Sequence, residues 1–289
     1  MNRRPLSNVV IRVLLFVLAL PAIAISVLLV QEPYFPLFSL LIALTTVLAS
    51  FESSVLFGES SARYAGSRLT IPLVGLTLPL TAYLQVSGVI REPYIGLLAI
   101  TVLSLLLSAQ VFRRNSESFA GIIPSIKMHT MVLVYPGFFI SYIVFMYALD
   151  GAATLILVFL AAVFLNDSLA YVFGRLFGRG KGGVVPISPN KSIPGFVGGL
   201  VTSPVILAVA QNLYPDLFPG SVWRSIVLGF AIGFATIFGD LIESGMKRSA
   251  TVKDSGSIIP GRGGILDSID SPIFAAPVYF YLYAALFLV

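Results

Sequence analysis

The sequence predicts an all-α polytopic membrane protein, and three observations lead to this fold class. Hydrophobic residues make up 57% of the 289 residues and charged residues only 11%, whereas soluble domains carry about 25% charged residues. The apolar residues gather in stretches of about 20, which is the length of a helix that crosses a bilayer. Basic residues concentrate in alternate connections between these stretches. We therefore expect one large membrane domain.

About nine apolar stretches are predicted to be transmembrane helices. The first is too long for the apolar core of a signal peptide, which has about 7–15 residues, so we expect it to be retained as a span. No repeat of fixed period and no low-complexity linker divides the chain. The nine predicted spans are residues 8–30, 34–51, 71–90, 95–112, 130–149, 152–173, 195–213, 222–244 and 265–289.

The charges between the spans predict the orientation. Of the 18 basic residues, only Arg91 and Arg224 fall on one side, and the other 16 fall at the N-terminus and in the connections on the opposite side. Basic connections stay in the cytoplasm. The N-terminus is therefore predicted to be cytoplasmic and the C-terminus outside, in the plasma (inner) membrane.

Polarity divides this continuous membrane domain into two halves. Residues 1–150 are predicted to be scaffold spans, and residues 151–289 are predicted to carry a cytoplasm-facing polar site, because charge well inside a predicted span appears only from Asp167 onward. Intramembrane charges are costly and are functional candidates by default. The connection 52–70 is predicted to be a short interfacial segment, and the connection 113–129 a basic surface loop.

Other residue types exclude several classes of site. The chain has no cysteine, so it forms neither a disulfide framework nor a thiolate metal site. His129 is the only histidine, which excludes a zinc centre built on several histidines. The net charge of +5 is typical of a membrane protein with basic cytoplasmic loops, and we expect no nucleic-acid partner.

The stretch from Asp240 to Asp270 holds the densest charge. It contains five of the 13 acidic residues and four of the 18 basic residues. In a helix over residues 222–248, Asp240, Glu243 and Lys247 share one face. One alternative is that these carboxylates pair with Lys247 or its neighbour Arg248 only to join helices.

A second carboxylate pair follows in the same stretch. Asp267 and Asp270 are three residues apart, so a helix that begins near Ile265 would direct them together. Hard oxygen ligands from two helix ends suit Mg²⁺, which binds through a few carboxylates plus substrate phosphates. We expect Mg²⁺, with a second cation left open. The expected ligands are Asp240, Asp267 and Asp270, with Glu243 as a weaker candidate.

Cations and glycines in the stretch indicate an anionic substrate. Lys247 and Arg248 are expected to hold phosphate oxygens, and the loop 260–264 lets backbone N–H groups approach an anion closely. Metal, cations and loop together indicate metal-assisted phosphoryl or nucleotidyl transfer.

The spacing of the whole stretch resembles the signature of the phosphatidate cytidylyltransferases. Two positions depart from that family: Arg262 stands where the family has His, and Ser268 where it has Arg. We hypothesise that Arg262 takes over part of the missing cation. The residues that carry the resemblance are Ser244-x-x-Lys247-Arg248, Lys253-Asp254, Pro260-Gly-x-Gly-Gly264 and Asp267-x-x-Asp270.

A second segment resembles the same family. An Asp-containing span with Asp167 leads into Ser188-Pro-x-Lys191-Ser192, with Ser192 where the family has Thr and Pro194 where it has Glu. The role of that Glu is therefore not carried over. Asp167 could instead pair with a neighbouring helix, Ser188 and Lys191 could belong to a loop that only sets topology, and Lys253-Asp254 could be an exposed turn.

The resemblance implies that a phosphate oxygen of phosphatidic acid attacks the α-phosphorus of CTP, giving CDP-diacylglycerol and pyrophosphate. It makes CTP, phosphatidic acid and membrane lipids the expected partners. Asp240, Lys247, Asp267 and Asp270 would be catalytic. The expected substrate-binding residues are Asp167, Ser188, Lys191, Arg248, Lys253, Asp254, Gly261, Arg262, Gly263 and Gly264.

Two other functions are weighed against this one. A CTP-dependent polyprenol kinase would use the same nucleotide but transfer the γ-phosphoryl group. A cation-coupled transporter also uses intramembrane carboxylates, but it predicts broken helices in two related halves. The sequence leaves open the oligomeric state, a homodimer included, the preferred acyl chains, and the preference for CTP or dCTP.

Overall fold

The computed structural model describes residues 18, 20–31, 34–57, 70–112, 119, 121–178, 183–261 and 263–288. Within them the regular secondary structure is helical and no strand occurs, and an isolated bridge joins Ile259 to Gly263. The all-α class is thereby confirmed. The helices are α2 (Pro36–Phe57), α3 (Thr70–Val86), α4 (Ile95–Ala109) with η2 (Gln110–Phe112), α6 (Ile122–Val132), η3 (Leu133–Phe138), α7 (Phe139–Phe145), η4 (Met146–Ala148), α8 (Ala152–Phe177), α9 (Ile193–Leu213), α10 (Val222–Ser249) and α11 (Leu266–Phe287).

Seven helical segments of the described chain are long and apolar enough to cross a membrane, and α3 is a shorter apolar helix. These eight coincide with the second to ninth predicted spans. The first predicted span, 8–30, lies partly outside the described residues, and its part from 20 to 28 is helical. The polytopic membrane fold is confirmed, and the total of nine spans stays a prediction.

Two predicted connections are wrong in part. The segment 52–70 is not a loop throughout, because α2 continues to Phe57 and buries Glu52. The segment 113–129 is helical from Ile122 onward, where α6, η3, α7 and η4 form one long helical segment. Pro124 does not prevent this, because it lies in the first turn of α6, where a backbone N–H has no intrahelical partner.

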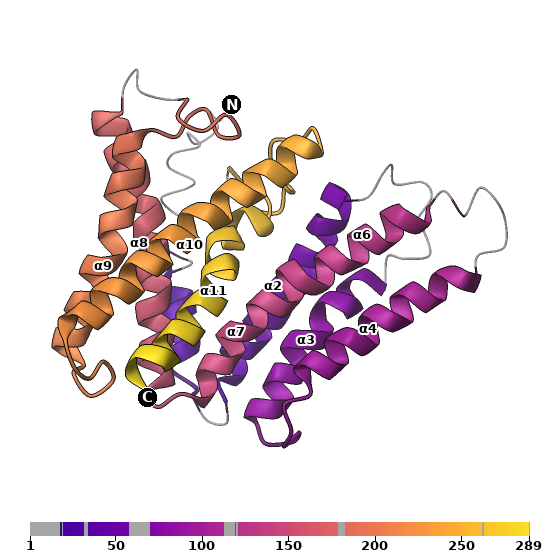
Figure 1. Cartoon of the computed structure of the whole chain (residues 1–289), viewed down its shortest axis with the longest axis horizontal. Helices are drawn as coiled ribbons and strands as arrows, with labels where there is room; N and C mark the ends of the chain where they lie inside the picture. Colours follow the sequence, from indigo (N-terminus) through magenta and orange to yellow (C-terminus); the bar gives the residue numbers. More distant parts are fainter. Residues whose placement is uncertain are drawn as a thin grey trace, which may run out of the picture.

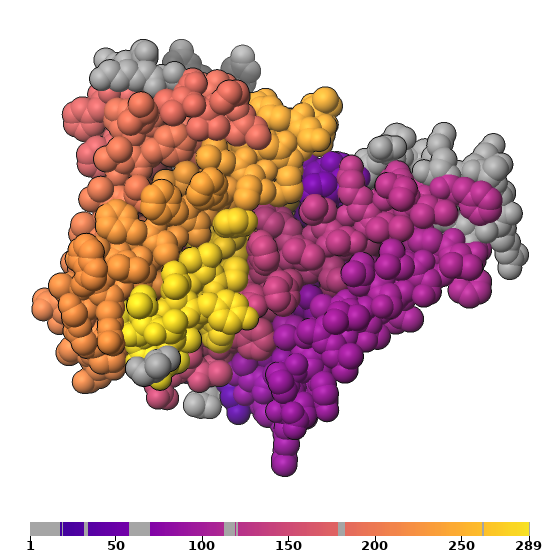
Figure 2. Space-filling model, viewed as in Figure 1, coloured from indigo at the N-terminus to yellow at the C-terminus, as the bar shows by residue number. Residues whose placement is uncertain are grey.

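Helix α11 joins two groups of helices (Figure 1). On one side, α10 packs against both α11 and α9, and α9 packs against α8. On the other side, α2, α3, α6 and α7 pack together, and α7 and α2 contact α11. Figure 2 shows α11 filling the space between α10 and the N-terminal helices on this face.

Aromatic side chains bind α11 to both groups. Tyr279 is fully buried, with its ring centroid 5.2 Å from that of Phe159, and its hydroxyl donates to the Leu155 carbonyl at 3.2 Å. On the other side, Phe274 meets Phe139 edge to face at 5.8 Å. The middle of α11 is therefore fixed against α7 and α8.

The connections after α8 and after α10 lie at one end of the bundle (Figure 1). The connection after α8 is joined to α10 by an ion pair between Lys191 and Asp240. Arg224 lies near the opposite end, where it donates to the Leu286 carbonyl at 3.0 Å. The densest charge of the sequence is thus collected at one end of the helices.

Candidate active site

A glycine brings the two carboxylate-bearing helices together. A Cβ atom on Gly239 of α10 would lie 2.8 Å from the Asp270 carbonyl oxygen and 3.2 Å from the Ser271 Cα. Only glycine permits this approach of the first turns of α11. The Ser271 hydroxyl completes the crossing by donating to the Thr236 carbonyl at 3.3 Å. Asp240, the next residue of α10, is thereby placed beside Asp270.

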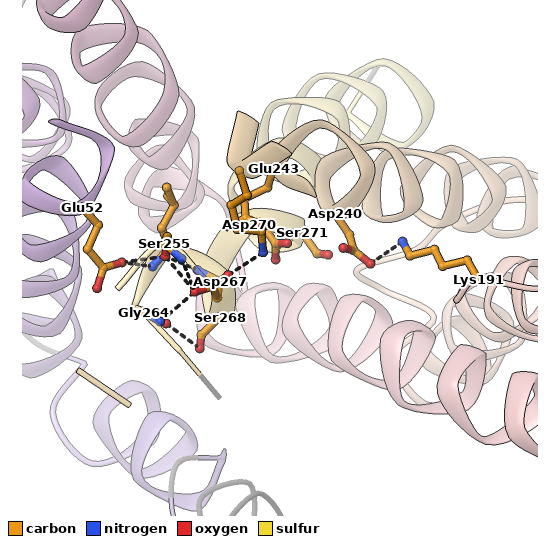
Figure 3. Close-up of polar contacts among 12 residues, drawn as sticks. Glu52, Lys191, Asp240, Glu243, Ser255, Gly264, Asp267, Ser268, Asp270 and Ser271 are labelled. Atoms are coloured by element: carbon orange, nitrogen blue, oxygen red, sulfur yellow. Dashed lines mark hydrogen bonds and ion pairs between the residues drawn. The ribbon is translucent and has the colours of Figure 1, made fainter. Parts of the chain in front are cut away.

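Four acidic side chains form what we call the carboxylate cluster: Asp167, Asp240, Glu243 and Asp270. Asp270 is 7% exposed, and its Oδ1 accepts a hydrogen bond from the Ser271 N–H at 2.7 Å. The other three carboxylates are close enough to act on it electrostatically. Figure 3 shows Glu243 and Asp270 beside each other, with Asp240 further along toward Lys191.

Two lysines partly neutralise this cluster. Lys247 forms ion pairs with Glu243, four residues before it on α10, and with Asp267 at 2.5 Å. Lys191 forms an ion pair with Asp240 from the connection before α9. The ion pair that the sequence offered as an alternative is therefore present between Glu243 and Lys247, but it lies within α10, and it is the pair with Asp267 that joins Lys247 to α11. Both ammonium groups nevertheless lie at the cluster, where an anionic substrate would meet them.

Asp267 is held on two sides: its Oδ1 pairs with Lys247, and its Oδ2 is held by the connection between α10 and α11. Its Oδ2 accepts hydrogen bonds from the Ser255 N–H at 2.8 Å, the Ser255 hydroxyl at 2.8 Å and the Gly264 N–H at 2.7 Å. The predicted helix start near Ile265 is confirmed, since α11 begins at Leu266. Asp267 and Asp270 nevertheless have different partners in this structure (Figure 3).

The glycine loop is closed on itself. Ile259 and Gly263 exchange backbone hydrogen bonds at 2.8 and 3.0 Å, and both Gly261 and Gly263 have positive φ angles, of 74° and 122°. The N–H groups of Gly263 and Gly264 thus donate inside the protein. The triphosphate cradle predicted for this loop stays a prediction, and Arg262 lies outside the described residues.

The remaining predicted residues lie around the same end of the bundle. Arg248, Lys253 and Asp254 are exposed where α10 ends. Ser188 is half-buried and begins the turn that leads to Lys191, whose N–H donates to the Ser188 carbonyl at 3.1 Å.

Ser192 and Pro194, the two residues of this segment that depart from the family pattern, both suit the start of α9. Ser192 caps α9, and its hydroxyl accepts from the Gly195 N–H at 3.4 Å. Pro194 lies in the first turn of α9, where it costs no hydrogen bond.

Sequence reasoning missed two residues of the N-terminal half. Glu52 of α2 accepts hydrogen bonds from the Ile265 N–H at 2.9 Å, the Leu266 N–H at 2.8 Å and the Ser255 hydroxyl at 3.0 Å. Tyr135 of η3 is buried, and its hydroxyl has no hydrogen-bond partner among the described residues, although it lies within electrostatic reach of the carboxylate cluster. Neither residue has a motif around it that could have identified it.

The carboxylate cluster fits a hard cation. It combines four carboxylates with two lysines, and Glu243 is fully buried, with Lys247 as its ion-pair partner among the described residues. The described part of the chain contains no group of three or more Asp, Glu, His or Cys side chains that are placed to hold one metal ion. The arrangement therefore suits an ion held by one or two carboxylates and completed by phosphate oxygens and water, which is how Mg²⁺ is usually bound.

Comparisons with known proteins give a family match over most of the chain. The model of the cytidylyltransferase family matches residues 10–286.

Individual relatives match over somewhat more than half of the chain. A phosphatidate cytidylyltransferase of Staphylococcus haemolyticus is 39% identical over 174 residues, 60% of this chain and 64% of that protein. The one of Staphylococcus aureus (strain COL) is 38% identical over the same shares of the two chains. The uncharacterized protein YnbB of Escherichia coli is 37% identical over 169 residues, 55% of each chain. The chain thus spans less than two thirds of the length of these relatives.

Proposed function

Since the chain belongs to the cytidylyltransferase family, we propose that it makes CDP-diacylglycerol and pyrophosphate from CTP and phosphatidic acid. The observation that carries this proposal is the carboxylate cluster, which collects four acidic side chains and two lysines at one end of an apolar helix bundle. Such a group of charges is costly within membrane-spanning helices unless it serves a charged ligand.

The reaction needs few groups from the protein beyond charge and position. A phosphate oxygen of phosphatidic acid attacks the α-phosphorus of CTP, one P–O bond forms, and the bond to the β-phosphate breaks to release pyrophosphate. Lys247 and Lys191 lie at the cluster and would contact phosphate oxygens, which lowers the repulsion between the two anionic substrates. Asp240 and Asp270 would hold Mg²⁺, with Glu243 as a weaker candidate. Bound Mg²⁺ would neutralise charge on the phosphates and orient them.

The lipid is proposed to reach this end of the bundle from the side, because its acyl chains need not leave the bilayer. An apolar groove of about 550 Å³ between α8 and α9 supports this route. It is lined by Leu165, Leu169, Phe173, Phe177, Pro194, Val197, Gly198, Val201, Thr202, Val205 and Ile206.

Product analysis tests the function. Purified protein is incubated with phosphatidic acid, Mg²⁺ and CTP labelled either in the cytosine ring or at the γ-phosphate. We expect the cytosine label in the lipid and the γ-label in pyrophosphate. A γ-label in the lipid, with CDP as the other product, would identify a lipid kinase. The same incubation with a polyprenol in place of phosphatidic acid is the matched control.

Thiol labelling tests the proposed orientation, in which the carboxylate cluster faces the cytoplasm. The chain has no cysteine, so single cysteines at the exposed Ser257 and Ser221 can be labelled without background. We expect an impermeant thiol reagent to modify Ser257→Cys only from the cytoplasmic side, and Ser221→Cys only from the outside. The opposite pattern would overturn the orientation and the proposed access of CTP.

A double-mutant cycle tests whether Arg262 stands in for the cation that is absent at Ser268. Ser268 is half-buried one turn into α11, and its hydroxyl donates to the Gly264 carbonyl at 3.3 Å. Arg262→Ala is expected to weaken kcat/KM for CTP by about 1–3 kcal/mol, the scale of a hydrogen bond to a charged group. Adding Ser268→Arg should recover part of that loss, whereas Ser268→Arg alone should be neutral or harmful. Strict additivity would show that the two positions are independent.

A further inference from the structure

We propose that Glu52, on α2, is a positioning residue that holds the glycine loop and the start of α11 and thereby sets Asp267 and Asp270 in place. This inference rests on the proposed function for its effect on the reaction, but not for its effect on the loop. Glu52 lies in the half of the chain whose spans were expected to serve only as scaffold. It is 5% exposed, so its carboxylate is almost fully removed from solvent.

Both carboxylate oxygens of Glu52 accept hydrogen bonds from backbone N–H groups at the start of α11. Oε1 accepts from the Ile265 N–H at 2.9 Å, and Oε2 accepts from the Leu266 N–H at 2.8 Å. These N–H groups belong to the N-terminal end of the helix, which leaves its first N–H groups without intrahelical partners and favours negative charge. In the described part of the chain, no lysine or arginine forms an ion pair with Glu52. Backbone donors of α11 therefore take the place of a counter-ion, and Glu52 caps this helix from another span.

Ser255 links Glu52 to Asp267. Its hydroxyl lies 3.0 Å from Glu52 Oε2 and 2.8 Å from Asp267 Oδ2, and it also accepts from the Asp267 N–H at 3.3 Å. A serine hydroxyl has one proton, so it donates to one of the two carboxylates at a time. Ser255 thus couples the position of Asp267 to Glu52, in addition to the backbone bonds of Ile265 and Leu266, as the left side of Figure 3 shows.

Two glycines of the connection leave space for the Glu52 side chain. A Cβ atom on Gly256 would lie 2.8 Å from Glu52 Cδ and 3.2 Å from Glu52 Cγ, and one on Gly264 would lie 2.6 Å from Glu52 Cδ. Neither glycine has a positive φ angle, so backbone conformation does not demand glycine at either position. Their lack of a side chain is explained by the approach of Glu52.

The arrangement ties the two halves of the chain together at the site. The segment that carries Ser255, Gly256 and Gly264 connects α10 to α11, and it meets α2 through Glu52. If Glu52 released it, the loop and the first turn of α11 would be free to move, and with them the carboxylates of Asp267 and Asp270. A misplacement of about 1 Å in such a site can cost about 100-fold in rate.

The test uses Glu52→Gln, which keeps the shape of the side chain but places an amide group opposite a backbone donor. We expect kcat to fall by about 10–100-fold, with a smaller change in KM for CTP. The readout that does not depend on activity is a nitroxide label on Ser257→Cys, in the otherwise cysteine-free chain. Its mobility, measured by electron paramagnetic resonance in the full-length protein, should rise with Glu52→Gln. A label on Asp216→Cys, in the exposed turn after α9, should not change.

Matched variants keep the test decisive. Glu92→Gln, in the exposed connection between α3 and α4, is the control glutamate and should leave both readouts unchanged. If Glu52→Gln does not fold, Gly256→Ala perturbs the same contact from the other side and should give the same increase in mobility. Unchanged mobility at Ser257 in a folded variant, or unchanged kcat with increased mobility, would overturn the proposal. If the parent protein itself lacks cytidylyl transfer, the proposed function fails, and the mobility alone decides whether Glu52 holds the loop.

Discussion

Replacing Asp270 with Asn is expected to lower cytidylyl transfer by at least about 100-fold, because a cation in such a transition state supplies several kcal/mol. The substitution keeps the shape of the side chain and removes one negative charge from the carboxylate cluster. Asp270 is 7% exposed and lies among the charges of Asp240, Asp167 and Glu243. Since like charges in a buried site repel one another, the variant is expected to be as resistant to unfolding as the parent protein, or more so.

The expected loss of activity is therefore separate from any loss of fold. Initial rates over a range of Mg²⁺ concentrations, together with a thermal unfolding curve in detergent, measure both effects. Asp216→Asn, in the exposed turn after α9, removes the same charge far from the cluster and is the control. A folded Asp270→Asn protein with near-parental turnover would show that Asp270 is not a ligand of the cation.

The helices were predictable because a bilayer imposes simple requirements on sequence. Each span must be apolar over about 20 residues. Helix α10 ends just after Lys247 and Arg248, and α11 begins just after the glycine loop, as the sequence indicated. Boundaries were harder where a signal was ambiguous. The prediction of a surface loop over residues 113–129 fails from Ile122 onward, because Pro124 lies in the first turn of α6, where a proline is tolerated.

The network around Glu52 could not be predicted, for a physical reason. A glutamate at the edge of an apolar stretch is usually interfacial, and only tertiary structure shows that Glu52 is buried against residues more than 200 positions later, at Ile265 and Leu266. Helix periodicity correctly placed Glu243 and Lys247 together, because i,i+4 neighbours share a face. It could not show that Asp267 is held by Ser255 and Gly264, since those contacts depend on how the loop closes.

Lys247 is expected to show the largest effect on stability. It is 15% exposed and forms ion pairs with Asp267 and with Glu243, whose side chain is fully buried. Lys247→Met keeps most of the side-chain volume and leaves Glu243 as an uncompensated buried charge. Removal of one partner from a buried ion pair typically costs about 3–5 kcal/mol. Asp267 should contribute less of this cost, since Ser255 and Gly264 still donate to it.

The double variant Lys247→Met/Glu243→Gln separates the structural role of Lys247 from its role toward phosphate. Replacing Glu243 as well removes the unpaired charge, so most of the lost free energy of unfolding should return. Activity should not return with it, because no ammonium group would then lie between the cluster and Asp267 to contact the phosphates of CTP. The two roles are distinguished by measuring unfolding in detergent and kcat/KM for CTP on both single variants and on the double variant. If activity recovers together with stability, Lys247 only joins the helices, and phosphate binding must be assigned to Lys191 and the exposed cations at the end of α10.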